Sequence, residues 1–373
     1  MSEELFIGLM SGTSIDGIDA ALVAFESAGQ LRVIDTLFTP FDKNIRAEIS
    51  YTAQNNQSLF SNQDSPLHQK LAPIYASACI RLLAKAKVLS DKVSGIANHG
   101  QTVKHEPDAS PSYSLQLGDG QTLADLTGIK TYTQFRQADL AAGGQGAPLM
   151  PAFHKALFTH NTLDSLDNSL ILNIGGIANI TCLRDPIVGF DTGPGNVLLD
   201  QWIEQHLGLH FDQSGQWAKQ GRVNTALLNK LSADHYFAES YPKSTGTDYF
   251  NLAWLSNRYP FLSNLAPEDV QATLVQLTVN SISDSILGLS GSPGAVFVCG
   301  GGANNPMIMH GLQTRLSDYD VKTTDVLGVP SDWVEAVGFA WLGYCRAHDI
   351  ASNIASVTGA KSEVVLGEVF LPR

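Results

Sequence analysis

Residues 8–17 read Gly-Leu-Met-Ser-Gly-Thr-Ser-Ile-Asp-Gly, and this stretch decides the fold of the first part of the chain. An apolar run from Leu5 to Met10 enters it, and a second β-prone run from Ile18 to Phe25 follows at once. Two strands joined by a turn rich in Gly, Ser, Thr and Asp predict a hairpin. The backbone N–H groups and hydroxyls of such a turn form a concave cluster of donors that suits phosphate oxygens. An ordinary hairpin turn is the alternative, because turns of this composition are common.

The second half of the chain repeats this theme. It predicts strands at Ser169 to Ile174, Ile177 to Leu183 and Ile187 to Phe190, with a tight turn at Gly175-Gly176. The third strand runs into Asp191-Thr192-Gly193-Pro194-Gly195-Asn196, and a helix is expected after it. Ligands gather at such strand ends in α/β sheets, and a helix N-terminus favours phosphate. The aspartate that opens this turn is therefore a candidate general base, and the turn is a candidate phosphate site.

A third glycine turn, at Gly300-Gly301-Gly302, follows a predicted strand from Ala295 to Cys299. Three adjacent glycines permit the close approach of a flat ligand or its α-phosphate. Each turn taken singly is more often structural than functional, but three of them at strand ends favour a nucleotide site. The chain holds no Walker-type stretch, and Gly193-x-Gly195 lacks the third glycine of a dinucleotide fingerprint.

Strands that alternate with helices predict an α/β fold. A hairpin opens each half of the chain, so we expect two lobes that form a cleft. The segment from Gln134 to Pro151 is rich in Gly, Ala and Gln, and it divides the chain into lobes 1–133 and 134–373, with the C-terminal segment free to pack on either lobe. Helices are expected at Pro66 to Val88, Val197 to Leu207, Asp269 to Leu289, from near Pro306, and at Asp332 to Ala347 with Asp332 as its N-cap.

The composition argues against several classes of protein. Lys and Arg number 23 and Asp and Glu 36, a formal charge of −13, whereas a general nucleic-acid binder needs a basic face. Hydrophobic residues at 44% and charged residues at 16% fit a packed globular protein. The four cysteines form no CxxC pair, so we expect buried thiols. Without a long apolar run or a signal-peptide pattern, a cytoplasmic protein is expected.

Several longer motifs follow one another over nearly the full chain. They are residues 8–17, Asn98 to Val103, Ala141 to Pro148, Asn173 to Thr181, Phe190 to Asn196, Pro242 to Gly246, Cys299 to Asn304, and Glu335-Ala336. Together they resemble the actin, Hsp70 and sugar-kinase superfamily and, within it, the anhydro-N-acetylmuramic acid kinase family. The resemblance implies a two-lobed, ribonuclease H-like α/β fold with a nucleotide cleft between the lobes.

The resemblance also implies an ATP-dependent kinase that uses Mg²⁺. Its members would convert 1,6-anhydro-N-acetylmuramic acid, ATP and water to N-acetylmuramic acid 6-phosphate and ADP, in cell-wall recycling and amino-sugar metabolism. Asp191 matches the catalytic aspartate that activates the water for opening of the anhydro ring. The expected partners are the sugar and ATP, with neither nucleic acid nor membrane, and a homodimer is expected because two-fold assemblies are the commonest.

The other site residues fall into two groups by the role that the resemblance implies. Substrate binding is assigned to Ser11, His99, Gln101 and Glu335. Asp16 is also expected to hold Mg²⁺ through water, since this cation keeps much of its hydration shell. ATP binding is assigned to Gly12, Thr13, Ser14, Ile15, Asp16, Gly17, Ile18, Asp19, Gly175, Gly193, Pro194, Gly195, Asn196, Gly300, Gly301, Gly302 and Asn304.

Other interpretations of these residues stay open at this point. His99 follows a predicted strand from Val93 to Ala97 and could be an ordinary turn histidine, and Glu335 could be a surface charge on a helix. Lys243 could contact phosphate or lie in solvent on its loop. A plain hexosamine kinase and a nucleotide-dependent switch ATPase are the alternative functions.

Overall fold

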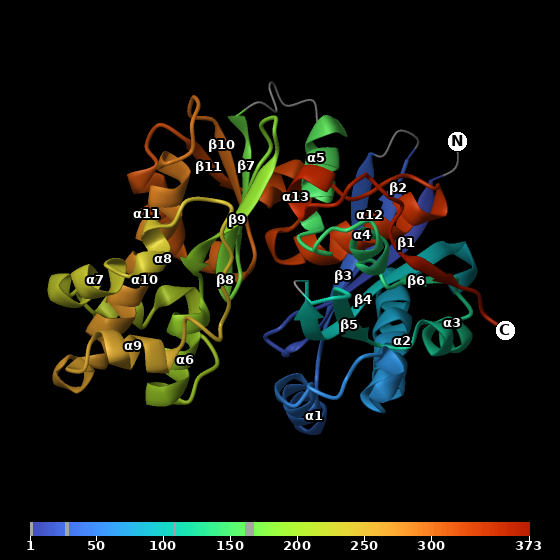
Figure 1. The fold of residues 1–373 in the computed structure, drawn as a ribbon, viewed down its shortest axis with the longest axis horizontal. Helices are drawn as coiled ribbons and strands as arrows, with labels where there is room; N and C mark the ends of the chain where they lie inside the picture. Colours follow the sequence, from blue (N-terminus) through green and yellow to red (C-terminus); the bar gives the residue numbers. More distant parts are fainter. Residues whose placement is uncertain (1–2, 27–29, 108, 161–167) are drawn as a thin grey trace. The chain divides into compact units, whose positions relative to one another are not determined.

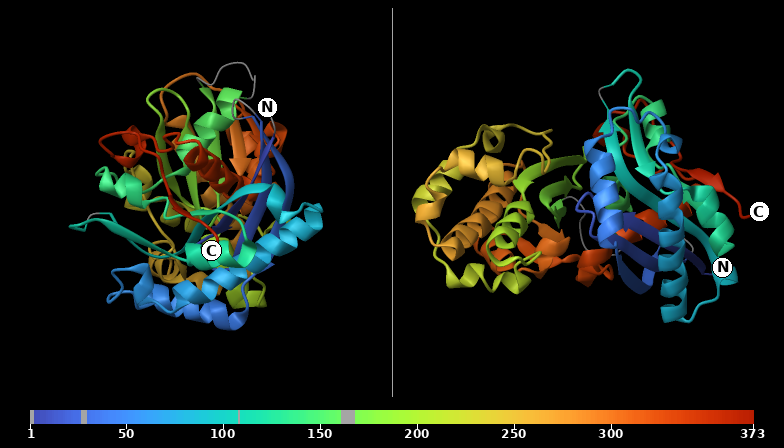
Figure 2. Two further views of the ribbon diagram at one scale, coloured as in Figure 1. Left: turned by 90° about the vertical axis from the view of Figure 1, so that its right-hand side faces the viewer. Right: turned by 90° about the horizontal axis from the view of Figure 1, so that it is seen from below.

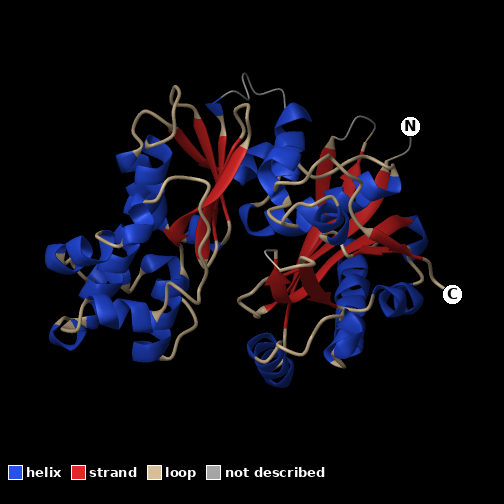
Figure 3. Cartoon of the chain, viewed as in Figure 1, coloured by secondary structure: helices blue, strands red, loops and turns tan. Residues whose placement is uncertain are grey.

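The computed structural model describes residues 3–26, 30–107, 109–160 and 168–373 (Figure 1). The chain forms two compact units. Unit 1 consists of Met1–Leu163, Leu327–Val329 and Trp333–Arg373, and unit 2 of Asp164–Val326 and Pro330–Asp332. In each unit the strands gather into one sheet and the helices lie outside it (Figure 3).

Unit 1 is built on a seven-stranded mixed sheet. Strands β1, β2 and β3 form an antiparallel meander, β4 and β6 continue the sheet parallel to β1, and β12 closes the edge beside β6 (Figure 2). The expected hairpin is therefore confirmed, with Met10 paired to Asp19 next to its turn. The strands are β1 (Glu4–Ser11), β2 (Gly17–Phe25), β3 (Leu31–Pro40), β4 (Val93–Glu106), β5 (Tyr113–Leu117, paired with β4), β6 (Thr131–Thr133) and β12 (Glu368–Phe370).

Unit 2 repeats the same strand order. Its sheet runs β11-β10-β7-β8-β9, in which β7, β8 and β9 form the meander and β10 and β11 are parallel to β7. Two units that share one mixed topology confirm the α/β, ribonuclease H-like fold class. The strands are β7 (Leu170–Ile174), β8 (Ile177–Cys182), β9 (Val188–Pro194), β10 (Ala295–Cys299) and β11 (Asp320–Thr323).

Two helices cover opposite faces of the unit 1 sheet. Ile7 and Leu9 of β1 share a core with Leu71 of α2 (Leu67–Ala86), whereas Gly8 between them faces α12 (Val334–Ala347). Side chains alternate between the faces of a strand, so the two helices lie on different sides. A Cβ on Gly8 would lie 1.8 Å from the carbonyl oxygen of Ala336. Only glycine permits α12 to approach β1 this closely.

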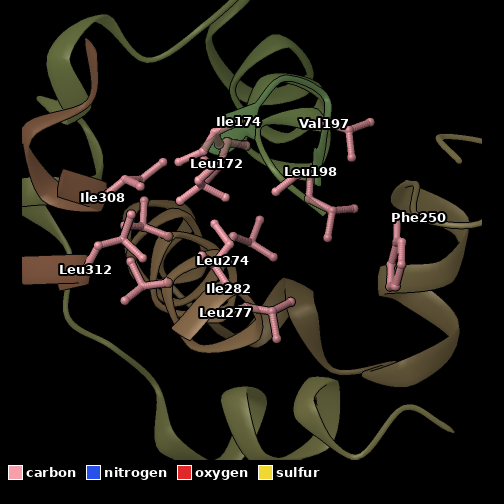
Figure 4. Close-up of a cluster of buried hydrophobic side chains, with 14 of the residues drawn as sticks. Leu172, Ile174, Val197, Leu198, Phe250, Leu274, Leu277, Ile282, Ile308 and Leu312 are labelled. Atoms are coloured by element: carbon pink, nitrogen blue, oxygen red, sulfur yellow. The ribbon is translucent and has the colours of Figure 1, made fainter. Parts of the chain in front are cut away.

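The core of unit 2 forms around the long helix α10 (Pro267–Leu287) (Figure 4). Its Leu274 and Ile282 belong to the same buried cluster as Leu172 of β7, Leu198 of α6 (Val197–Leu207) and Leu312 of α11 (Pro306–Arg315). The apolar spacing of 269–289 therefore predicted this helix correctly, within two residues at each end. The buried cluster packs β7 and β9 against α6, the helix that follows β9, and against α10.

The remaining helices are short and flank the two sheets. None of the described helices is long and apolar enough to cross a membrane. In unit 1 they are α1 (Lys43–Gln54), α3 (Gly120–Thr127), α4 (Gln137–Ala141), α5 (Met150–His160) and α13 (Ala355–Thr358), and in unit 2 α7 (Thr225–Ser232), α8 (His235–Ala238) and α9 (Leu252–Arg258).

A buried carboxylate links two segments of unit 1 that are far apart in the sequence. Asp139 on α4 is fully buried, and its Oδ1 accepts hydrogen bonds from Thr358 Oγ1 at 2.6 Å and Asn353 Nδ2 at 2.7 Å. Its Oδ2 accepts from the backbone N–H of Gly146 at 2.8 Å. These bonds tie the glycine-rich segment to the C-terminal segment, so both belong to unit 1.

Three local predictions from the sequence were wrong. The strand expected to end at Phe190 continues as β9 to Pro194, so Asp191 lies within the strand and does not open a turn. The strand expected to stop at Ala97 continues as β4 to Glu106, because the polar residues that follow pair with β1 and β5. Asp332 is not the N-cap of α12, which is Trp333. Asp332 instead lies in a short 3₁₀ turn, Ser331–Trp333, where its Oδ1 accepts a hydrogen bond from Asn304 Nδ2 at 2.6 Å.

Candidate active site

The turn between β1 and β2 is braced from β4. Gln101 donates from Nε2 to the carbonyl oxygen of Gly12 at 3.1 Å, and the N–H of Ile15 donates to the same oxygen at 3.2 Å. The side chains of Thr13 and Ser14 are exposed and form no hydrogen bond with any residue that the structure describes. The turn therefore presents two hydroxyls outward from a fixed backbone, as a phosphate-binding turn requires.

Ser11 closes the base of the same turn. Its Oγ lies 2.6 Å from the hydroxyl of Tyr75 on α2 and donates to the carbonyl oxygen of Gly100 at 3.3 Å. Ser11, His99 and Gln101 are all buried, at 1%, 5% and 1% exposure. Three of the four residues assigned to the sugar thus lie together where β1 meets β4.

His99 is held by an arginine that the sequence analysis did not identify. Arg136 donates from Nη2 to Nε2 of His99 at 2.9 Å and from Nη1 to the carbonyl oxygen of Gly146 at 2.8 Å. A ring nitrogen that accepts a hydrogen bond belongs to a neutral imidazole, with its hydrogen on Nδ1. Burial and the charge of Arg136 hold the pKa of His99 well below its usual range. The ring of Phe339 on α12 lies 4.7 Å from the imidazole.

Glu335 occupies the first turn of α12, the helix fixed against Gly8. The residue is accessible to solvent, yet the protein around its carboxyl group raises the pKa of Glu335, and the charge of Arg136 partly opposes this. Its charge raises the pKa of Arg136, although surrounding protein lowers that pKa to about 10 in total. Glu335 therefore belongs to the same electrostatic neighbourhood as Arg136 and His99, within unit 1.

Asp191, the expected general base, lies on β9 of unit 2. Its Oδ2 accepts hydrogen bonds from Ser244 Oγ at 2.8 Å and from the backbone N–H of Thr245 at 3.0 Å. No described residue donates a hydrogen bond to its Oδ1. Burial raises the pKa of Asp191, and the bonds from Thr245 and Ser244 partly oppose this. The carboxylate is fixed through one oxygen, and the other is available as a base.

The main chain of Asp191 is held as well. Its N–H donates to the carbonyl oxygen of Lys243 at 3.1 Å, and its carbonyl oxygen accepts from the hydroxyl of Tyr236 at 2.8 Å. Lys243 donates from Nζ to the carbonyl oxygen of Tyr236 at 3.0 Å and lies over the Tyr236 ring. Lys243 therefore fastens the loop and is not a solvated lysine. Tyr236, Ser244 and Thr245 were missed from the sequence because they act through Asp191.

The glycine turns of unit 2 lie side by side. The N–H groups of Gly195 and Asn196 donate to the carbonyl oxygens of Gly176 and Gly175 at 2.9 and 2.8 Å. Asn196 also donates from Nδ2 to the carbonyl oxygen of Ile174 at 3.0 Å. These two amides, at the start of α6, are already used within the protein. A nucleotide at this turn would have to be held by other atoms.

The turn after β10 adjoins these two. A Cβ on Gly300, where φ is +79°, would lie 2.4 Å from Oδ1 of Asn173, and one on Gly302 would lie 2.3 Å from the side chain of Ile174. A Cβ on Gly301 would meet nothing closer than Asn196 Nδ2 at 3.8 Å. Gly300 and Gly302 are therefore required by packing, whereas Gly301 faces open space.

The groups that could hold a cation are few in this part of the molecule. No group of three or more His, Cys, Asp or Glu side chains placed to hold a metal ion occurs among the described residues. Asp16 is exposed in the turn between β1 and β2 and offers carboxylate oxygens. Mg²⁺ is usually bound by one or two carboxylates together with substrate phosphates. The donors present thus fit Mg²⁺ that arrives with a nucleotide.

Comparison with known proteins identifies the family. A family model described as anhydro-N-acetylmuramic acid kinase matches residues 4–372. The chain belongs to the anhydro-N-acetylmuramic acid kinase family. An anhydro-N-acetylmuramic acid kinase of Haemophilus influenzae is 43% identical over 383 residues, which cover 99% of this chain and 98% of that one. One of Coxiella burnetii is 43% identical over 375 residues, with the same coverage of each chain.

The family assignment confirms the resemblance seen in the sequence, and the enzyme class is that of a kinase. Solved structures were compared with the fold as well. An activator of 2-hydroxyisocaproyl-CoA dehydratase from Clostridium difficile with bound ADPNP has a TM-score of 0.44 and 11% identity, covering 92% of this chain and 96% of that one. A ROK family glucokinase from Streptomyces griseus with glucose and AMPPNP has a TM-score of 0.37 and 12% identity, covering 90% and 98%.

Proposed function

We propose that this anhydro-N-acetylmuramic acid kinase family member hydrolyses the 1,6-anhydro ring of 1,6-anhydro-N-acetylmuramic acid and phosphorylates O6 with ATP in one reaction. The observation that carries the proposal is the carboxylate of Asp191, which is fixed through Oδ2 and unbonded at Oδ1. A kinase acting on a free hydroxyl needs one base for that hydroxyl. An anhydro sugar has no free O6, so the base must act on water instead.

Asp191 supplies that base. Oδ1 takes a proton from water as the water oxygen bonds to C1, and the C1–O6 bond breaks with its electron pair on O6. That oxygen attacks the γ-phosphorus, and the bond to the β-phosphate oxygen breaks to release ADP. The proton on Asp191 then returns to solvent. Burial raises the pKa of Asp191, and a base is most effective when its pKa lies near the working pH.

ATP is assigned to the outward hydroxyls of Thr13 and Ser14 and to the glycine turns of unit 2. Phosphoryl transfer needs mainly positioning and charge neutralisation. Asp16 would hold Mg²⁺ through water, and the cation supplies neutralisation of phosphate charge when bound. Gly301 is the glycine whose open side suits a flat base. The whole segment from Gly12 to Asp19 is proposed to bind the phosphates of ATP.

The sugar is assigned to Ser11, His99, Gln101 and Glu335. Glu335 would accept a hydrogen bond from a sugar hydroxyl, because this solvent-accessible residue stands in the first turn of α12. N-Acetylmuramic acid 6-phosphate would be the product. A muramic acid with an anhydro bridge comes from murein, so the enzyme would serve cell-wall recycling. A homodimer stays a prediction, which sedimentation equilibrium would test.

The test is turnover of 1,6-anhydro-N-acetylmuramic acid with ATP in ¹⁸O-labelled water. We expect label on the C1 hydroxyl and phosphate on O6, in equal amounts. Phosphorylation of N-acetylhexosamines without label would contradict the proposal and indicate a plain hexosamine kinase. ATP hydrolysis that no sugar accelerates would indicate a switch ATPase.

A further inference from the structure

Arg136 carries a charge that the protein only partly compensates. Its Nη1 and Nη2 donate to two neutral acceptors, the carbonyl oxygen of Gly146 and Nε2 of His99. Its Nε–H is buried and has no acceptor among the described residues. A guanidinium has five N–H donors, so each terminal nitrogen keeps one further hydrogen.

No carboxylate of the described chain lies within 4.0 Å of this guanidinium. Glu335 acts on Arg136 through its charge only. Charges that are removed from water are normally paired with an opposite charge. Even with its pKa lowered to about 10, Arg136 is protonated at neutral pH. Hydrogen bonds therefore hold the guanidinium of Arg136 in place, but no described carboxylate forms an ion pair with it.

The orientation of Arg136 is nevertheless fixed. Gly146, which accepts from Nη1, is itself held through its N–H by the buried carboxylate of Asp139 at 2.8 Å. His99, which accepts from Nη2, is held between β4 and the ring of Phe339. Since a neutral imidazole brings no opposing charge, both braces leave the positive charge available. A preorganised guanidinium of this kind recognises a planar carboxylate or phosphate.

We propose that Arg136 binds the carboxylate of the lactyl group on O3 of the muramic sugar and so selects muramic acids from other anhydro sugars. This inference rests on the proposed function, because it takes its ligand from the proposed substrate. His99, the neighbour of Arg136, is already among the residues assigned to that sugar. The lactyl carboxylate is the chemical group that distinguishes N-acetylmuramic acid from N-acetylglucosamine. It is also the anionic group of the sugar that a guanidinium would select.

The experiment measures binding by titration calorimetry with two sugars. These are 1,6-anhydro-N-acetylmuramic acid and 1,6-anhydro-N-acetylglucosamine, which lacks the lactyl group. We expect Arg136→Gln to lower the affinity for the muramic sugar about 10- to 100-fold, as for a lost charge-assisted hydrogen bond. Its affinity for 1,6-anhydro-N-acetylglucosamine should fall less than about threefold. Arg136→Lys keeps the charge but lacks the planar guanidinium. Its affinity for the muramic sugar should lie between those of the wild type and Arg136→Gln. Arg81→Gln, an exposed arginine of unit 1, is the control and should change neither affinity.

Three results would overturn the inference. Arg136→Gln could weaken the binding of both sugars equally, which indicates a purely structural role, or weaken the binding of neither. The wild type could also show no preference for the muramic sugar. Circular dichroism of each variant verifies its fold. The labelled-water assay tests the proposed function separately, because it detects cleavage of the C1–O6 bond and does not depend on how the carboxylate is recognised. Selective binding without ¹⁸O incorporation would leave this inference standing and remove the proposed mechanism.

Discussion

The backbone N–H of Thr245 donates a hydrogen bond to Oδ2 of Asp191 at 3.0 Å, across 54 positions of the chain. The carboxylate on β9 is thus positioned by a loop that folds back onto it, and not by its own strand. Ser244 adds a second bond to the same oxygen at 2.8 Å. Because Oδ2 accepts two hydrogen bonds, the carboxylate cannot rotate freely and Oδ1 stays in one orientation. This arrangement underlies the first two predictions.

Replacement of Asp191, the proposed base, should slow the reaction and spare nucleotide binding. We expect Asp191→Asn to lower kcat about 10²- to 10⁴-fold, the usual contribution of general-base catalysis, because an amide cannot take the proton from water. ATP affinity, measured by calorimetry, should stay within about twofold. Asp318→Asn changes an exposed carboxylate of the same unit and should leave both quantities unchanged. Full turnover by Asp191→Asn would exclude the assigned role.

Removal of the Ser244 hydroxyl should move the pH profile. The bond from Ser244 stabilises the ionised carboxylate and so lowers the pKa of Asp191 against the effect of burial. Ser244→Ala should therefore raise that pKa further, and the acidic limb of the kcat/KM profile should move to higher pH, with activity recovering as pH rises. Ser240→Ala, an exposed serine nearby, is the control. An unmoved acidic limb would show that Ser244 does not tune the base.

The glycine in the middle of β1 should be indispensable for packing. Gly8→Ala places a methyl group 1.8 Å from the carbonyl oxygen of Ala336, so α12 must shift. Overpacking of this kind costs about 1–3 kcal/mol of the free energy of unfolding, and KM for the sugar should rise because Glu335 moves with α12. Gly288→Ala is the matched control, since its Cβ would meet nothing closer than 3.2 Å. Urea unfolding and steady-state kinetics measure the two effects.

Asp139 should be essential for stability. Its carboxylate is fully buried and accepts three hydrogen bonds, from Gly146, Asn353 and Thr358. Asp139→Ala leaves these donors without an acceptor, and we expect a loss of about 3 kcal/mol or more in the free energy of unfolding. Asp91→Ala, at an exposed position without such bonds, should cost less than about 0.5 kcal/mol. A small loss for Asp139→Ala in urea titration would contradict this role.

The sequence predicted β1, β2, β7, β8 and β10 because their signals are local, whereas β3, β5, β6, β11 and β12 were not predicted. Alternation of apolar runs with glycine turns placed the β1–β2 hairpin and the β7–β8 hairpin correctly. The extent of β4 could not be read in this way, since Asn98 to Thr102 has a turn-like composition. Those residues are strand because β1 and β5 lie on both sides and complete their hydrogen bonds. Tertiary pairing overrides local preference in such a segment.

The candidate site was predictable in its motifs and not in its supports. Asp191 and Ser11 stand in recognisable glycine-rich contexts, whereas Arg136 is a single cation at the start of the short helix α4 and Ser244 is one hydroxyl in a Lys-Ser-Thr run. What makes them important is a hydrogen bond to a distant partner, over 37 positions for Arg136 and His99 and 53 for Ser244 and Asp191. No periodicity or composition encodes such a pairing.

All four cysteines of the chain are buried and free of disulfides. Thiol-directed dyes react with accessible thiolates, so the native protein should resist labelling. Cysteines introduced on the surface, one in each unit, would then accept a donor and an acceptor fluorophore without any prior removal of native thiols. Single-molecule energy transfer on such a pair would follow in real time how the molecule responds to ATP.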